Sequence, residues 1–397
     1  MRTIAREQRT DIDEALNGNL LGCLGPAMLE KDIHVTDALA ALASIRVSHT
    51  AYRKDRRSQR DTRPAEVTVE TRMIFAGGTC LAKAHGLIER MSEDIDIKVV
   101  LDEVPEGYAL AGGRGDRSRL GELHVQVCER LKGLGFTLID AGDEENPRSR
   151  DNRRYFLLHL AFQAEFGGSE FALRPELKIE LIHRPPMLPV EPREMGYLLD
   201  QLVGRASAAP FSMPCISVAE TLGEKILSLL RRCAWNWDGR QRGSFDAALV
   251  RHIYDTWRIC AISPDSVDEA SVVFEALVMK DVAEFGAQHE EFADEPFGTL
   301  HRALNRTATE PTLRHHFDER LIPLVFAAER PVYDNCLASF TAAAHRMLRA
   351  QSKARSRPRS TPRPRPRRAM SLPATRIAGN RSVGCAISSC EATISSS

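Results

Sequence analysis

Apolar residues recur at helical spacing through most of the second half of the chain. Side chains three or four residues apart share one face of a helix, and residues 218–232 contain such an apolar stripe. Its members are Val218, Leu222, Ile226 and Leu229. Similar spacing continues to about residue 350 and also occurs in residues 26–44. The pattern predicts a helix near the start of the chain and a helical region over residues 217–350.

Residues 71–216 combine short apolar or alternating runs with helical spacing. A period of two, or a short apolar run, predicts strands at residues 73–76, 95–101, 137–139, 155–162 and 176–182. Helical spacing predicts helices at residues 80–89 and 120–134. The expected fold class is therefore α+β, with a sheet-containing domain followed by a helical domain.

We expect four regions in the chain. They are a helical segment with a basic loop (residues 1–70), the sheet domain (71–216), the helical domain (217–350) and a basic tail (351–397). The tail repeats Arg with Pro and Ser and has little apolar periodicity, so it cannot bury enough surface to fold and should be disordered. A basic arm that binds RNA and a tail without function both fit this composition.

Composition indicates a soluble globular protein. The chain has 397 residues, of which 43% are hydrophobic and 27% charged, enough for a sizeable core. No stretch approaches the ~20 apolar residues of a membrane span, and the charged N-terminus lacks a signal-peptide core, so we expect a cytoplasmic protein. The nine cysteines include no CxxC pair and indicate neither a disulfide framework nor a zinc site.

Asp94 and Asp96 alternate with Ile95 and Ile97, so a strand places both carboxylates on one face. Their mutual repulsion is unfavourable unless a cation lies between them, and magnesium prefers hard oxygen ligands. Glu180, on the polar face of a later strand, offers a third carboxylate. The three acids are therefore candidate ligands of Mg²⁺, although each strand taken alone also fits a solvated polar face.

Gly77, Gly78 and Thr79 lie at a predicted strand-to-helix junction. Small residues there let backbone amides and the helix N-terminus approach a phosphate, so these are candidate nucleotide-binding residues. Lys83 follows Thr79 by one helical turn and can share the phosphate-facing side. The Walker pattern GxxxxGK[ST] is absent, and a simple turn followed by a surface lysine is the alternative.

Lys225 falls within the apolar stripe of residues 218–232, where a charged side chain seldom lies without a partner. A buried carboxylate or a triphosphate would satisfy it, and snorkelling to solvent is the alternative. His252 and Asp255 are three residues apart in a predicted helix, on a side away from its apolar residues. An exposed polar face is the simplest interpretation of that pair.

Three short segments form one extended motif: residues 75–83 (FAGGTCLAK), 86–90 (GLIER) and 92–96 (SEDID). Supporting segments are residues 29–32, 218–226 and 251–255. Together they resemble the AbiEii/AbiGii toxin family of nucleotidyltransferases, well over residues 24–260 and weakly over 261–345. Cys80 and Ala82 depart from the family pattern.

The resemblance implies a nucleotidyltransferase-like fold, in which a mixed sheet carries the glycine turn and the acidic strand and a helical domain follows. It also implies roles for residues named above: Gly78 and Thr79 for the triphosphate, Asp94 and Asp96 for the metal, Lys225 for a phosphate, and Asp255 as metal ligand or base. Family members act as toxins of toxin–antitoxin systems linked to phage defence, and some add nucleotides to the 3′ end of tRNA.

The expected function is a magnesium-dependent nucleotidyltransferase that moves a nucleoside monophosphate from a nucleoside triphosphate to an acceptor. The acceptor would be an RNA, with the 3′ end of tRNA as one candidate, and a cognate antitoxin would be a partner. A formal charge of about −9 on residues 1–350 fits poorly with an RNA substrate, although local basic patches can still guide phosphates. The alternatives are a phosphotransferase with the same ligands and a non-catalytic nucleotide- or RNA-binding module.

Overall fold

The computed structural model describes residues 1–54, 63–139, 148–167, 174–241 and 243–355, with side chains described as far as residue 349. Most of the expected basic loop (55–62) and nearly all of the expected tail (356–397) lie outside the described residues. The last helix, α12 (Tyr333–Arg355), continues past residue 350, where we expected the helical region to end.

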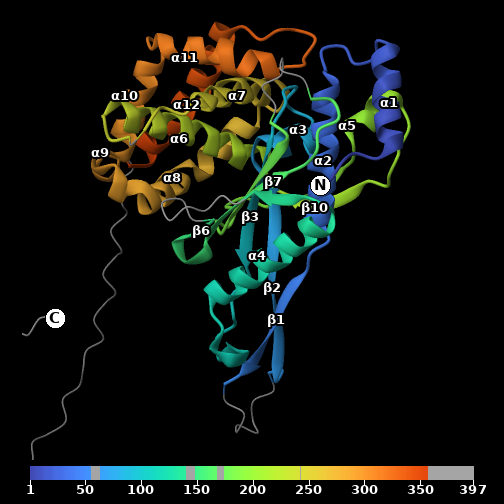
Figure 1. Cartoon of the computed structure of the whole chain (residues 1–397). Helices are drawn as coiled ribbons and strands as arrows, with labels where there is room; N and C mark the ends of the chain where they lie inside the picture. Colours follow the sequence, from blue (N-terminus) through green and yellow to red (C-terminus); the bar gives the residue numbers. More distant parts are fainter. Residues whose placement is uncertain (55–62, 140–147, 168–173, 242, 356–397) are drawn as a thin grey trace, which may run out of the picture. The chain divides into compact units, whose positions relative to one another are not determined.

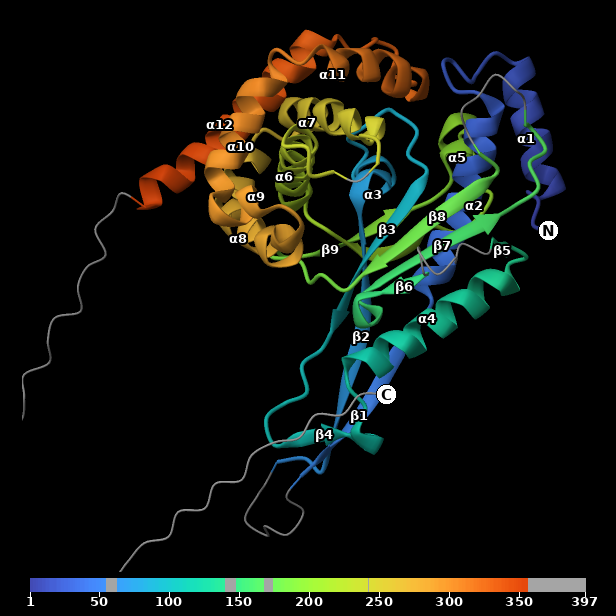
Figure 2. The ribbon, with the colours of Figure 1, turned by 60° about the vertical axis from the view of Figure 1, so that its left-hand side comes forward.

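The strands form one mixed sheet (Figures 1 and 2). Its main path runs β4-β1-β2-β3-β8-β7-β5, while β10 pairs with β2 and β9, and β6 pairs with β7. The strands are β1 (Val47–Arg53), β2 (Glu66–Ala76), β3 (Asp94–Leu101), β4 (Tyr108–Leu110), β5 (Thr137–Ile139), β6 (Ser149–Arg150), β7 (Tyr155–Ala161), β8 (Glu176–Ile182), β9 (Glu191–Met195) and β10 (Phe211–Cys215). Only β3–β8 and β10–β2 are parallel pairs among the described strands.

Two groups of helices accompany the sheet. The first group is α1 (Arg6–Asn17), α2 (Pro26–Ala43), α3 (Gly77–Lys83), α4 (Asp116–Gly133) and α5 (Leu198–Val203). Apolar residues of α2 and α4 share one core with the sheet. The second group, which includes α12, is α6 (Val218–Trp237), α7 (Arg251–Ile262), α8 (Ser266–Phe285), α9 (Glu290–Asp294), α10 (Pro296–Thr307) and α11 (Pro311–His316), with a core of its own. The expected α+β fold class, a mixed sheet followed by helices, is confirmed.

α6 lies at the centre of the second group. Ser217 caps its start, since the Ser217 hydroxyl accepts a hydrogen bond of 3.1 Å from the Glu220 backbone N–H. Leu222, Ile226 and Leu229 are fully buried, as their spacing predicted. No helix in the described part of the chain is long and apolar enough to cross a membrane.

The structure corrects the helix predicted at residues 80–89. α3 begins at Gly77 and ends at Lys83, so the two glycines form its first turn. Gly86 has a φ of +62°, in the left-handed region where a helix commonly ends. After Gly86 the chain has no regular secondary structure until Arg90, which forms an isolated antiparallel bridge with Val325. This bridge brings Arg90 to the helical part of the chain.

Candidate active site

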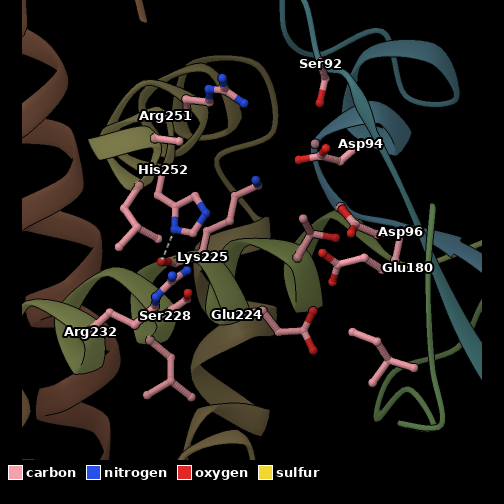
Figure 3. Close-up of a pocket in the computed structure, with 18 of the residues that line it drawn as sticks. Ser92, Asp94, Asp96, Glu180, Glu224, Lys225, Ser228, Arg232, Arg251 and His252 are labelled. Carbon is pink, nitrogen blue, oxygen red and sulfur yellow. Dashed lines mark hydrogen bonds between the residues drawn. The ribbon is translucent and has the colours of Figure 1, made fainter. Parts of the chain in front are cut away.

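Three carboxylates from two neighbouring strands line one pocket of about 400 Å³ (Figure 3). β3 and β8 run parallel with Asp96 directly opposite Glu180, and Asp94 lies two residues earlier on the same face of β3. Ile95 and Ile97, which alternate with the two aspartates, are buried in the core of the sheet. The register of one strand pair thus brings together all three residues that the sequence suggested as metal ligands.

The charge around Asp96 is unbalanced. Burial raises the pKa of the Asp96 carboxyl to about 7, and the negative charges of Glu180 and Asp94 add to this effect. The cations of Lys178 and Lys225 oppose the shift without cancelling it. Lys178 itself forms an ion pair with Glu180. When all three acids are ionised, the neighbouring lysines do not balance their negative charge. This imbalance favours the binding of a cation.

The paired glycines let the backbone of α3 lie against the acids. Gly77 has a φ of +76°, and a side chain there would collide with the carboxylate of Asp96. A Cβ atom on Gly78 would lie 2.9 Å from Ser92 Oγ and 3.0 Å from Arg90 Nη2. Both glycines line the pocket. Their small size is therefore required by the close approach of Asp96, Ser92 and Arg90.

Thr79 and Lys83 lie on the other side of α3. They line a second pocket of about 190 Å³ and do not line the pocket of the three acids. The Thr79 hydroxyl donates a hydrogen bond to the backbone carbonyl of Asp94. Lys83 Nζ lies 2.6 Å from Asp32 Oδ1, and its side chain is nearly buried. Both residues are engaged by protein groups, so the structure gives no support to direct phosphate binding by either.

Asp255 is fully buried and both of its oxygens are engaged. Arg90 donates to it through Nε and Nη2, each at 2.7 Å, and Lys225 Nζ lies 2.8 Å from Oδ2. Burial alone would raise the pKa of Asp255, but the two cations hold it well below the ordinary range. The exposed polar face, which was the simplest interpretation of the sequence pattern around Asp255, is thus wrong. Its carboxylate does not line the pocket, so its arrangement differs from that of a metal ligand or a base.

Lys225 has the buried carboxylate partner that was one of our interpretations. Figure 3 shows Lys225 on the wall that faces the three acids. Arg90 also lines the pocket, and the Asp255 carboxylate holds both cations in place. His252 accompanies them, with Nδ1 3.1 Å from the Lys225 carbonyl. Burial, and then the charge of Lys225, lower the pKa of His252 well below its ordinary value, so this ring is neutral.

Sequence reasoning gave no role to Arg251, which lines the same wall. Within the described residues its guanidinium has no hydrogen-bond or ion-pair partner, and its Nε is buried. Burial and the nearby Arg90 lower the pKa of Arg251. By contrast, Lys98 lies 2.8 Å from Glu220 and 2.7 Å from Glu224 in the same pocket. The sequence held two signals for Arg251: it begins the supporting segment 251–255, and it lies four residues before Asp255 on the same face of a helix.

Comparison with known families decides the identity of the chain. The sequence profile of the family "Nucleotidyl transferase AbiEii toxin, Type IV TA system" matches residues 64–339. The chain belongs to this family. The resemblance found in the sequence is therefore confirmed, and the chain is a nucleotidyltransferase of a toxin family of type IV toxin–antitoxin systems.

Two solved structures are similar to this AbiEii-family toxin. One is the nucleotidyltransferase toxin MenT4 of Mycobacterium tuberculosis, with 17% identity, 66% of this chain and 76% of the other covered, and a TM-score of 0.33. The other is a protein of H. pylori assigned as a nucleotidyltransferase, with 13% identity, 83% and 99% covered, and a TM-score of 0.38. The comparison with curated proteins gives no match.

Proposed function

We propose that this AbiEii-family toxin transfers a nucleoside monophosphate from a nucleoside triphosphate to an acceptor, with Mg²⁺ bound by Asp94, Asp96 and Glu180. The observation that carries the proposal is the meeting of three carboxylates on one wall of the pocket with a wall of cations opposite. Nucleotidyltransferases typically use a divalent metal. Carboxylate oxygens are the donors that Mg²⁺ prefers, and the raised pKa of Asp96 reflects negative charge that such an ion would balance.

The bound metal would lower the barrier by balancing the charge of the phosphates and of the attacking oxygen. The protein would supply the rest from the opposite wall. Arg251 feels the charges of Asp94, Glu93 and Asp255 but forms no hydrogen bond or ion pair within the described residues, so its guanidinium is available for a phosphate, which it can bind through two N–H groups. Arg90 and Lys225 are held in place by Asp255 and face the same space. Asp255 is then a positioning residue that acts through these two cations.

We infer that the acceptor is an RNA, with the 3′ end of tRNA as the first candidate, and that the toxin acts with a cognate antitoxin. Family membership supports the toxin–antitoxin setting. The RNA acceptor rests on the resemblance alone. A phosphotransferase would use the same acids and cations, and a binding module would need neither the metal nor turnover.

One experiment distinguishes nucleotidyl transfer from phosphotransfer and from binding without turnover. The full-length protein is incubated with total RNA, Mg²⁺ and each nucleoside triphosphate, labelled in turn at the α- and the γ-phosphate. Incorporation of the α label alone is expected. Transfer of the γ label would show a phosphotransferase, and absence of both labels with intact nucleotide binding would show a binding module. Asp96→Asn is the inactive control, and the size of the labelled RNA identifies the acceptor.

A further inference from the structure

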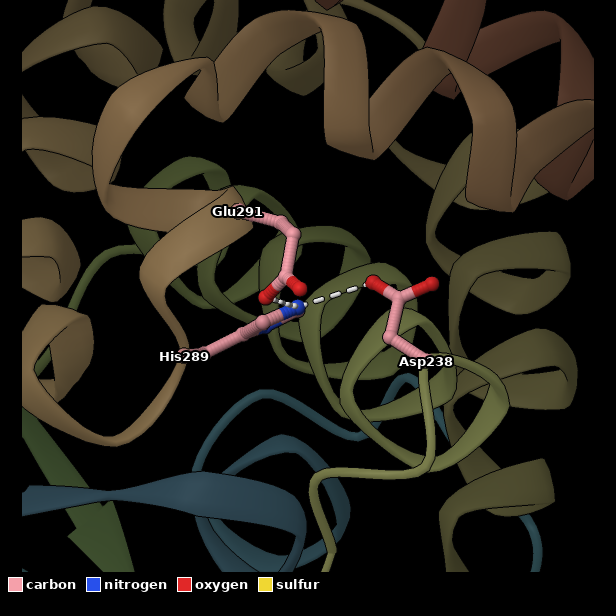
Figure 4. Close-up of side chains that lie close together, drawn as sticks. All are labelled: Asp238, His289 and Glu291. Atoms are coloured by element: carbon pink, nitrogen blue, oxygen red, sulfur yellow. Dashed lines mark hydrogen bonds and ion pairs between the residues drawn. The ribbon is translucent and has the colours of Figure 1, made fainter.

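A second group of metal-ligating side chains lies away from this pocket. Asp238 directly follows α6, His289 lies in the turn before α9, and Glu291 is in the first turn of α9 (Figure 4). One ligand atom from each lies within 4.8 Å of the others. None of the three residues lines the pocket of Asp94 and Asp96. They bring together parts of the chain about 50 residues apart, which local sequence spacing does not reveal.

The spacing of the donor atoms suits a small ion. His289 Nε2 lies 2.9 Å from Asp238 Oδ2 and 3.8 Å from Glu291 Oε2. Ligand atoms about 2.0–2.1 Å from a tetrahedral Zn²⁺ are roughly 3.3 Å from one another. The two observed separations lie on either side of this value, so small side-chain shifts can seat the ion.

Two polar atoms of the cluster are buried without a partner among the described residues. Glu291 Oε2 accepts no hydrogen bond, although Oε1 of the same carboxylate accepts one from Arg240. His289 is 2% exposed and its Nδ1 is also unpartnered. The Glu291 oxygen without a donor is the one that lies 3.8 Å from His289 Nε2, and a bound cation would give it a partner. The side chains of Asp238 and Glu291 are 37% and 38% exposed, which leaves the ion a path from solvent.

We propose that Asp238, His289 and Glu291 bind one Zn²⁺ ion. An imidazole nitrogen with two carboxylate oxygens is a donor set that zinc accepts, whereas Mg²⁺ prefers oxygen ligands alone. A water molecule would complete the coordination on the solvent side. The ion connects the end of α6 to the start of α9, and it is independent of nucleotidyl transfer at the other site.

The test is a zinc titration of the full-length Asp96→Asn variant, the parent of the variants below. This substitution weakens the acidic site as a competitor for zinc, and EDTA treatment first removes any bound metal. Calorimetry with ZnCl₂ alone should give one ion per chain, and thermal unfolding should shift upward with zinc. His289→Gln should lower zinc affinity by about 100-fold or more. Co²⁺ in place of zinc should give visible d–d bands of a four-coordinate site that disappear in His289→Gln.

Glu291→Gln is the second ligand variant, because this partly exposed side chain can change without disturbing the core. It should weaken zinc binding by about 10-fold or more. His315→Gln is the matched control, since His315 forms an exposed pair with Glu319 at 3.1 Å and belongs to no such cluster among the described residues. The zinc affinity of His315→Gln should equal that of the parent, the Asp96→Asn protein. The proposal is overturned if the parent binds no zinc, or if Glu291→Gln and folded His289→Gln bind it as tightly as His315→Gln does.

Discussion

Asp96 is half-buried in the wall of the pocket and Asp255 is fully buried behind it, yet their surroundings are opposite in charge. Asp255 accepts hydrogen bonds from Arg90 and forms an ion pair with Lys225. These two cations keep the pKa of Asp255 low, although burial alone would raise it. Asp96 lies beside Glu180 and Asp94, and burial with these acids raises its pKa to about 7. The protein itself satisfies Asp255, whereas Asp96 is left for a ligand from outside.

The charges around each carboxylate therefore distinguish a structural acid, Asp255, from a candidate functional acid, Asp96. An acid with its own cations contributes to stability and holds those cations in place. An acid pushed against other acids lowers stability until a metal binds, and such perturbed groups concentrate at functional sites. The two residues should therefore respond to the same substitution in opposite ways.

Asp96→Asn should give the largest effect, a loss of nucleotidyl transfer of ~10³-fold or more, because it removes one charge from the metal-binding set. The free energy of unfolding without metal should stay equal or increase, since a repelled carboxylate is replaced by a neutral amide of the same size. Rates of α-label transfer at saturating Mg²⁺ and denaturant unfolding measure both. Asp268→Asn, at an exposed ion pair with Arg346, is the control. Normal turnover in Asp96→Asn would contradict the metal site.

Asp255→Asn should lower the free energy of unfolding by about 3–5 kcal/mol, because it leaves two buried cations facing each other without an acid. Lys225→Met should cost less, since Arg90 still donates to both oxygens of Asp255. Urea unfolding of the two variants gives the comparison. Equal stability of Asp255→Asn and the parent would show that the Asp255 ion pairs contribute nothing to the fold.

Arg251→Met should raise the KM for the nucleoside triphosphate by about 10–100-fold, the equivalent of one charge-assisted contact. Stability should hold or improve, because the buried Arg251 guanidinium forms no hydrogen bond or ion pair within the described residues that the substitution would break. Steady-state kinetics and the thermal shift caused by nucleotide measure these effects. Arg232→Met is the matched variant, since Arg232 lines the same pocket but lies 3.1 Å from Asp246, and its effect on KM should be smaller. Equal KM in Arg251→Met and the parent would remove Arg251 from the phosphate site.

The fourth prediction concerns the pH dependence of stability. The folded protein holds the Asp96 proton up to about pH 7, whereas an unfolded chain releases it near pH 4. Between these values the folded state binds more protons, so the Asp96 contribution to stability decreases as the pH rises through this window. Metal-free protein should show that decrease, and Asp96→Asn should flatten it. Thermal unfolding from pH 4 to pH 8 in EDTA tests it, and identical profiles for the two proteins would exclude Asp96 as the source.

Local periodicity predicted much of this site, but it could not supply the partners across the chain. A period of two placed Asp94 and Asp96 on one face, and the polar face of a later strand offered Glu180. These acids come together through the register in which β3 pairs with β8. That register depends on the whole sheet and cannot be read from either strand alone. Arg90 and Asp255 are 165 residues apart, so an apparently exposed acid proved to be buried.

Lys83 shows the same limit. Its position one turn after Thr79 suggested a phosphate contact, but its ammonium group forms an ion pair with Asp32 of α2. Helical spacing predicted most of α2 and α6: α6 buries one apolar stripe, whereas α2 is buried on nearly every side. It extended α3 too far, since the left-handed Gly86 ends that helix and a residue pattern alone does not fix φ.

The bond between Arg90 and Asp255 also limits how the molecule can move. Arg90 follows α3 and Asp255 lies in α7, and the same stretch is tied to the chain before α12 by the Met91 N–H to Leu324 carbonyl bond at 2.8 Å. A second bond joins the Phe326 N–H to the Glu89 carbonyl at 3.0 Å. A hinge that swung the helices away from the sheet would have to break a buried ion pair and these backbone bonds at once, so such openings are rare. We therefore expect nucleotide to enter the pocket without the helices moving away from the sheet, and amide hydrogen exchange in residues 89–91 to be among the slowest in the protein.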